Sequence, residues 1–167
     1  MSELPRPAPD FTLPGDDGTA YGLEELKGTP FVLFFYPRDN TAGCTKEAIG
    51  FTHLQPEFDA LGVKVFGVSK DSLASHEKFR TKQNLSIGLL SDENEKVCEA
   101  FDVWQEKKMY GKTFFGIVRS TFLIDGTGQI VREWRKVKVD GHAEEVLAAA
   151  KAWLEHGVEL HIVADKC

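Results

Sequence analysis

Residues 31–47, FVLFFYPRDNTAGCTKE, contain the transition that decides the fold. Their first six positions, Phe31 to Tyr36, are all apolar or aromatic, which predicts a short buried strand. Pro37 ends that strand because proline has no backbone N–H to donate to a neighbouring strand. A helix is expected from Thr41 to Leu61, because apolar residues then recur at helical spacing. The stretch therefore predicts a buried strand that leads through a short loop into a helix.

The segments on either side alternate between strand and helix patterns. Residues 10–13 and 19–21 flank a turn-forming stretch and predict an N-terminal β-hairpin, whereas residues 102–117 follow no regular period and are expected to be irregular. The remaining strands are expected at 63–68, 89–90, 120–124 and 130–134, and the remaining helices at 72–83, 95–101 and 142–154. This order predicts an α/β fold with a central mixed β-sheet flanked by helices, either thioredoxin-like or doubly wound.

Length and composition limit the class of protein. With 167 residues and 18.6 kDa, the chain is expected to form one domain over 1–167, with 156–167 as a C-terminal tail. A net charge of −6 without a basic stripe argues against nucleic-acid binding. No apolar run approaches the ~18 residues of a membrane span. The first residues carry no basic-then-apolar signal, so a cytoplasmic location without membrane contact is expected.

The chain has three cysteines, Cys44, Cys98 and Cys167, and no C-x-x-C motif. An odd number of widely spaced cysteines is typical neither of a disulfide framework nor of a thiolate zinc site. Each cysteine is therefore either an inert apolar residue or a reactive thiol.

The position of Cys44 favours reactivity. If Thr41 is the N-cap of the predicted helix, the Cys44 sulfur lies among backbone N–H groups that have no acceptor within the helix. The positive end of the helix dipole also stabilises an anion there, so both effects favour the thiolate. Gly43 adds no side chain beside the sulfur, the Thr41 hydroxyl can donate to a bound oxygen, and Pro37 encloses the loop. The alternative at this point is an ordinary buried cysteine.

The motif Pro37-x-x-x-Thr41-x-x-Cys44 resembles the peroxidatic motif of peroxiredoxins. The run from Phe35 to Glu47 resembles the bacterioferritin comigratory protein (PrxQ) subfamily, and so do the segments GIVRSTFLID at 116–125 and WRKVKVDGHA at 134–143. The resemblance extends from about residue 7 to about residue 154. It implies a thioredoxin-like fold with an N-terminal addition, and reduction of hydrogen peroxide and organic hydroperoxides without a metal or other cofactor.

The same resemblance implies roles for individual residues. Cys44 is expected to be the peroxidatic cysteine, and Thr41 to position the peroxide and the thiolate. Arg119 is expected to stabilise the thiolate and the charge on the reacting oxygens, because a guanidinium stays charged and presents a planar fork of donors. Pro37 is expected to shield the pocket. Glu47 is expected either to pair with an arginine or to remain solvated in the first turn of the helix.

The chain departs from the subfamily in the step that reduces the sulfenic acid. Many members of the subfamily carry a resolving cysteine five residues after the peroxidatic one, where this chain has Ile49, or in the following helix, where it has Arg80. The first expectation is therefore an external thiol, namely thioredoxin, glutaredoxin or a small thiol. Cys167 is the second candidate for resolving cysteine and Cys98 the third. A monomer or weak homodimer is expected from the resemblance.

Two other functions are compatible with parts of the sequence. A cysteine hydrolase would use Cys44 with His53, His76 or His142 as the base. A thioredoxin-like binding or holdase domain without peroxidase activity would use exposed apolar residues such as Phe114 and Phe115.

Overall fold

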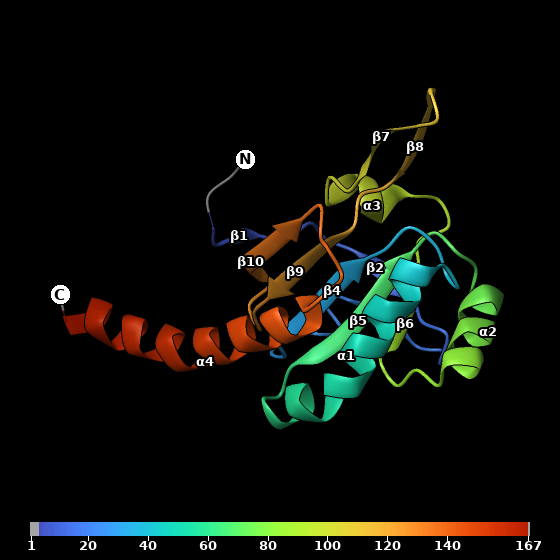
Figure 1. The fold of residues 1–167 in the computed structure, drawn as a ribbon. Coiled ribbons are helices and arrows are strands. Elements are labelled where there is room, and N and C mark those ends of the chain that lie inside the picture. The colour runs from blue at the N-terminus through green and yellow to red at the C-terminus, as the bar shows by residue number, and fades with distance from the viewer. Residues whose placement is uncertain (1–3, 167) are drawn as a thin grey trace.

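A six-stranded mixed sheet forms the centre of the molecule, in the order β1-β10-β9-β4-β5-β6 (Figure 1). The computed structural model describes residues 4–166. Strands β4, β5 and β6 are parallel, whereas β9 is antiparallel to β4, β10 to β9, and β1 to β10. The strands of this sheet are β1 (Arg6–Pro7), β4 (Phe31–Phe35), β5 (Lys64–Ser69), β6 (Gly88–Ser91), β9 (Ser120–Ile124) and β10 (Gln129–Arg135).

Helices and two small sheets surround the central sheet (Figure 1). Two antiparallel hairpins form separate small sheets, β2 (Thr12–Pro14) with β3 (Ala20–Gly22), and β7 (Trp104–Met109) with β8 (Lys112–Ile117). The helices are α1 (Ala42–Ala60), α2 (Leu73–Gln83), α3 (Lys96–Ala100) and α4 (His142–Lys166). The predicted α/β architecture with an N-terminal hairpin is confirmed.

Strand β4 divides the core into two clusters, because successive side chains of a strand point to opposite faces of the sheet. Phe31, Leu33 and Phe35 belong to one cluster, and Val32 and Phe34 belong to the other. All five residues are buried, as expected for a central strand covered on both faces.

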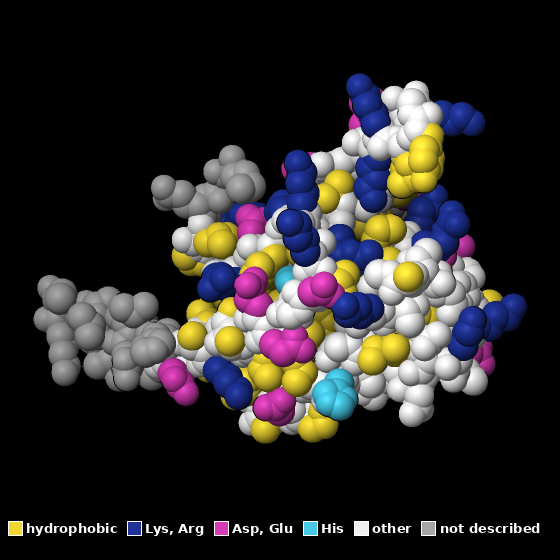
Figure 2. Space-filling view, in the orientation of Figure 1, with side chains coloured by type: hydrophobic (Ala, Val, Ile, Leu, Met, Phe, Trp, Pro, Cys, Tyr) yellow, Lys and Arg dark blue, Asp and Glu magenta, His cyan; other side chains and the backbone are white. Residues whose placement is uncertain are grey.

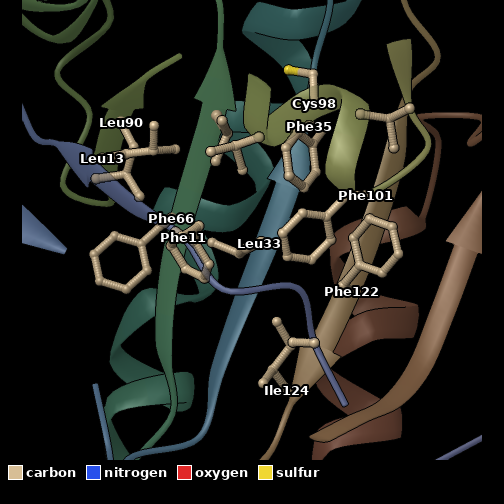
Figure 3. Close-up of a cluster of buried hydrophobic side chains, with 14 of the residues drawn as sticks. Phe11, Leu13, Leu33, Phe35, Phe66, Leu90, Cys98, Phe101, Phe122 and Ile124 are labelled. Atoms are coloured by element: carbon tan, nitrogen blue, oxygen red, sulfur yellow. The ribbon is translucent and has the colours of Figure 1, made fainter. Parts of the chain in front are cut away.

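Different elements cover the two faces. On the first face, the β2–β3 hairpin and α3 contribute residues such as Leu13 and Cys98 (Figure 3). On the second face, α1, α2 and α4 contribute residues such as Phe51, Phe79 and Val146. Because the loop after β4 leads into α1, the first turn of α1 lies over the second face.

The segment 102–117 corrects a sequence prediction. It was expected to be irregular but forms the β7–β8 hairpin, which projects from the body of the molecule (Figure 1). Tyr110 and Gly111 make its turn with positive φ angles of 53° and 75°. The prediction was wrong because much of the hairpin is exposed on both faces, so no alternation of apolar and polar residues marks it. Phe114 and Phe115 are exposed, and Figure 2 shows hydrophobic and basic side chains together on this projecting part.

The C-terminal segment corrects another prediction. The last helix was expected to end at residue 154, with a tail at 156–167 that is either mobile or strand-like, but α4 continues to Lys166. Cys167 lies outside the described residues. In the described part of the chain, no helix is both long enough and apolar enough to cross a bilayer.

Candidate active site

Cys44 occupies the first turn of α1, directly after the buried strand and its loop. Thr41 is the N-cap, as predicted, and the Thr45 N–H donates to the Thr41 carbonyl at 2.9 Å. The N–H groups of Ala42, Gly43 and Cys44 therefore precede the first helical hydrogen bond and remain available to an anion. The helix dipole adds to this, because its positive end lies at the same turn.

Arg119 connects the Cys44 sulfur to a buried carboxylate. It lies in the short link between β8 and β9, and its Nη2 donates to Cys44 Sγ at 3.3 Å. Its Nη1 donates to Glu47 Oε1 at 2.6 Å. Glu47 is three positions after Cys44 on α1 and is fully enclosed. The pairing of Glu47 with an arginine is therefore found in the structure, and the alternative of a solvated glutamate is wrong.

Glu47 is an energetically costly partner for Arg119. Burial raises the pKa of Glu47 to about 7, although the charge and hydrogen bond of Arg119 act in the opposite direction. Within the described residues, Glu47 Oε2 has no hydrogen-bond partner. A half-satisfied buried carboxylate destabilises the folded state, so its presence points to a role in holding the guanidinium.

Gly43 allows this arginine to reach the sulfur. A Cβ at position 43 would lie 3.1 Å from Arg119 Nη2, closer than side chains normally approach. The sequence predicted that Gly43 leaves room for a substrate. The structure adds that it leaves room for the guanidinium.

Thr41 and Pro37 lie in the loop that precedes Cys44. The Thr41 hydroxyl donates to the Arg38 carbonyl at 3.0 Å and makes no capping bond to the helix. Pro37 is half-buried and lies two residues after the end of β4. The structure thus places Thr41 at the N-cap of α1 and Pro37 in the loop before it. Arg119 contacts both Glu47 and Cys44.

Cys98 lies in a different part of the core. It is fully buried in the cluster on the first face of the sheet, whereas Cys44 belongs to the cluster on the second face (Figure 3). Burial, followed by the hydrogen bond to Asp92, raises the pKa of the Cys98 thiol. The central sheet lies between the Cys98 and Cys44 sulfurs, and this separation argues against Cys98 as the resolving cysteine.

Arg80 is held at the end of α2. Its Nη2 donates to Asp16 Oδ1 at 2.8 Å and to the Ile87 carbonyl at 2.7 Å, and its Nη1 donates to the Leu85 carbonyl at 2.8 Å. Ile49, at the other position discussed for a resolving cysteine, is exposed on α1. Arg80 therefore links α2 to Asp16 and to the segment 85–87.

The three candidate imidazoles for a hydrolase are not paired with Cys44. His53 is exposed on α1. The His142 Nε2 lies 2.8 Å from Thr121 Oγ1, and burial lowers the pKa of His142 to about 4. His76 contacts Asp39. In the part of the chain with described side chains, none of these rings is hydrogen-bonded to Cys44, so the hydrolase interpretation has no support.

Sequence reasoning missed two features near the site. Asp39 and His76 form a buried pair under the loop that carries Pro37. Asp39 lies in the run that resembles the subfamily, but nothing in that run indicates a partner on α2. Lys107 on β7 lies near Arg119. Burial lowers the pKa of Lys107, and the positive charge of Arg119 lowers it further. Both features depend on contacts between distant segments, which no local pattern indicates.

Comparison with known proteins identifies the family. A family model described as AhpC/TSA family matches residues 4–133, most of the chain. The chain belongs to the AhpC/TSA family. Relatives include Peroxiredoxin Bcp of Xanthomonas campestris pv. campestris, 51% identical over 150 residues, which span 90% of this chain and 94% of the relative. Peroxiredoxin Bcp of Bacillus subtilis is 48% identical over 149 residues, which span 89% and 95%.

Solved structures agree with this assignment. The bacterioferritin comigratory protein of Xanthomonas campestris, studied for its alkyl peroxide reduction activity, superposes with a TM-score of 0.81 at 51% identity. The superposition covers 85% of this chain and 90% of that one. The peroxiredoxin described here is therefore a thiol-dependent peroxidase with the predicted thioredoxin-like fold, and the interpretation as a binding or holdase domain is not supported.

The Xanthomonas structures also include two cysteine-to-serine variants of peroxiredoxin Q. Their two substituted positions are separated by the same number of residues as Cys44 and Arg80 in this peroxiredoxin. This spacing agrees with the resemblance that placed Arg80 where related chains carry a resolving cysteine.

Proposed function

We propose that Cys44 reduces hydrogen peroxide and organic hydroperoxides, and that an external thiol regenerates it. The Cys44 thiolate attacks one oxygen of the peroxide, so that an S–O bond forms while the O–O bond breaks. The other oxygen leaves as hydroxide or alkoxide and takes up a proton from solvent. Cys44 is left as a sulfenic acid.

The observation that carries this proposal is the 3.3 Å contact between Arg119 Nη2 and Cys44 Sγ at the start of α1. During the attack, negative charge spreads from the sulfur onto both oxygens. Donors fixed in advance beside the sulfur stabilise that charge more in the transition state than in the ground state. Glu47 holds the guanidinium in position through its hydrogen bond to Arg119 Nη1, and Thr41 is the N-cap of the helix that carries Cys44.

The regeneration step is assigned to an external thiol, namely thioredoxin, glutaredoxin or a small thiol. One thiol attacks the sulfenic acid, releasing water and forming a mixed disulfide with Cys44. A second thiol then releases Cys44 and leaves with the first as a disulfide. Two findings support this assignment: Arg80 is a bound arginine, and Cys98 lies on the other face of the sheet. Cys167 remains the alternative resolving residue.

Intact-mass spectrometry after one equivalent of hydrogen peroxide, with a sulfenic-acid trap present, tests both steps. We expect one trapped adduct on Cys44 and none in Cys44→Ser. A loss of two hydrogens that disappears in Cys167→Ser would instead assign the resolving step to Cys167. A chain in which peroxide leaves Cys44 unoxidised would overturn the peroxidase assignment.

We also propose that this peroxiredoxin works in the reducing cytoplasm as a monomer or weak homodimer. The odd number and wide spacing of the cysteines give no disulfide framework, which is typical of a protein of a reducing compartment. Sedimentation velocity over a range of concentrations tests the oligomeric state. A dimer that persists on dilution would contradict it.

A further inference from the structure

His76 and Asp39 form a buried polar cluster under the active-site loop. His76, on α2, is completely enclosed, and Asp39, in the loop after β4, is 5% exposed. The His76 Nδ1 lies 2.8 Å from Asp39 Oδ2, and its Nε2 lies 2.8 Å from the Leu90 carbonyl oxygen. Asp39 also accepts from the Tyr36 hydroxyl at 2.6 Å and from the Ser75 hydroxyl at 2.8 Å.

The partners of His76 determine its protonation. A carbonyl oxygen only accepts hydrogen bonds, so Nε2 must carry a hydrogen. Nδ1 faces a carboxylate that is already accepting from two hydroxyls, so Nδ1 must carry one as well. The ring is therefore an imidazolium that is ion-paired to Asp39.

The electrostatics of the cluster agree with this protonation. Burial acts to lower the pKa of His76, but the hydrogen bond and charge of Asp39 outweigh it, and the pKa is raised above its ordinary value. Asp71, one residue before the N-cap of α2, acts in the same direction, and Tyr36 is the other titratable group beside the ring. A buried charge pair of this kind is held firmly, because breaking it would leave an uncompensated charge.

Asp39 links this pair to the reacting sulfur. It lies two positions before the N-cap Thr41, between the end of β4 and the start of α1. Its backbone N–H donates to Asp71 Oδ2 at 2.8 Å, so both its backbone and its side chain are fixed. The next residue, Asn40, has a positive φ of 61°, which few other residues adopt easily. The path of the loop past Cys44 therefore depends on where Asp39 is held.

We propose that His76 is a positioning residue for the peroxidase reaction, which fixes through Asp39 the loop that leads from Pro37 to the N-cap Thr41 and on to Cys44. This inference rests on the proposed function and adds a residue on α2 to the groups that determine its rate. A small displacement of a reacting geometry lowers a rate by up to about 10²-fold, so loss of this contact has a measurable effect.

Two substitutions of His76 separate its two hydrogen bonds. His76→Asn places an amide nitrogen near the position of Nδ1 and keeps a donor to Asp39. His76→Gln places it near the position of Nε2 and keeps the donor to the Leu90 carbonyl. Each variant is compared for the rate of Cys44 oxidation by hydrogen peroxide and for the rate of Cys44 alkylation by iodoacetamide, which does not use the peroxide geometry. His53→Gln, on the exposed side of α1, is the matched control.

We expect His76→Gln to lower the rate of Cys44 oxidation by peroxide by about 10-fold or more, and His76→Asn to keep most of that rate. The rate of Cys44 alkylation should stay unchanged in both variants. Equal peroxide rates in the two variants, or parallel losses of peroxide and alkylation rates, would overturn the proposal. If His76→Gln does not fold, Asp39→Asn removes the carboxylate that His76 Nδ1 contacts, and an unchanged peroxide rate in that variant would overturn the proposal. If peroxide does not oxidise Cys44 in the unsubstituted protein, the peroxidase function itself is overturned.

Discussion

Glu47→Gln removes a buried charge while keeping the shape of the side chain, and it should make the protein more stable at alkaline pH. In the folded state burial raises the pKa of Glu47 from 4.5 to about 7. The folded protein therefore holds this proton over a range in which the unfolded chain has lost it. The stabilising contribution is complete below pH 4.5 and is lost as the pH rises through about 7.

The size of the effect follows from the shift in pKa. Each pKa unit corresponds to ~1.4 kcal/mol, so ionising Glu47 in the folded state costs about 3 kcal/mol relative to the unfolded chain. This net value already includes the attraction of Arg119, which donates to Glu47 Oε1 at 2.6 Å. Glutamine keeps an acceptor for that donor but carries no charge. The variant and the unsubstituted protein should therefore be equally stable near pH 4.5 and differ by about 3 kcal/mol near pH 8.

Urea denaturation of the reduced proteins near pH 5 and near pH 8 measures this difference. Glu57→Gln is the control, because Glu57 lies on the same helix with its side chain 54% exposed. The reasoning is refuted if Glu47→Gln is no more stable than the unsubstituted protein near pH 8. That result would mean that Arg119 stabilises the carboxylate by more than burial destabilises it. The peroxide rate of the variant should fall, because a neutral acceptor holds the guanidinium less firmly.

Four further substitutions test other parts of the structure. Arg119→Lys keeps a positive charge but cannot bridge two partners, so stopped-flow measurement should show peroxide oxidation about 10²-fold slower; an unchanged rate would contradict its role. Gly43→Ala introduces a Cβ 3.1 Å from the same guanidinium, and the rate should fall about 10-fold while circular dichroism shows unchanged helix content. Cys98→Ala should lower the free energy of unfolding by about 1 kcal/mol and leave turnover with dithiothreitol unchanged; lost turnover would return this thiol to the mechanism. Arg80→Gln leaves a buried carboxylate without its cation, so urea denaturation should show a loss of about 2 kcal/mol.

The sequence predicted those features of the site that depend on neighbouring residues. The buried strand, the N-cap at Thr41 and the place of Cys44 in the first turn all follow from local pattern, because strand burial and helix capping depend on residues close together in the chain. Arg119 could be assigned only through resemblance to a known family. Arg119 lies 72 positions after Glu47 and 75 positions after Cys44 in the sequence. No pattern in a single sequence indicates contacts over such separations.

The features that were missed have physical reasons. The β7–β8 hairpin was not predicted because its two exposed faces remove the alternation that marks a half-buried strand. The pair of Asp39 and His76 was not predicted because a single histidine on a polar helix gives no sign of a carboxylate 37 positions away. The extension of α4 was not predicted because a pattern that changes near a chain end gives poor evidence of where a helix ends.

The burial of Cys44 imposes a limit on turnover. With 1% of the residue exposed, Cys44 has almost no surface that a thiol carried by another protein could reach. We therefore expect a protein reductant to act only after the first turns of α1 open, a step whose rate does not depend on the concentration of the reductant. As the concentration of a protein reductant rises, the reduction rate should approach a plateau equal to the opening rate. At such concentrations, the opening of the helix and not the amount of reductant determines how fast the oxidised enzyme is reduced.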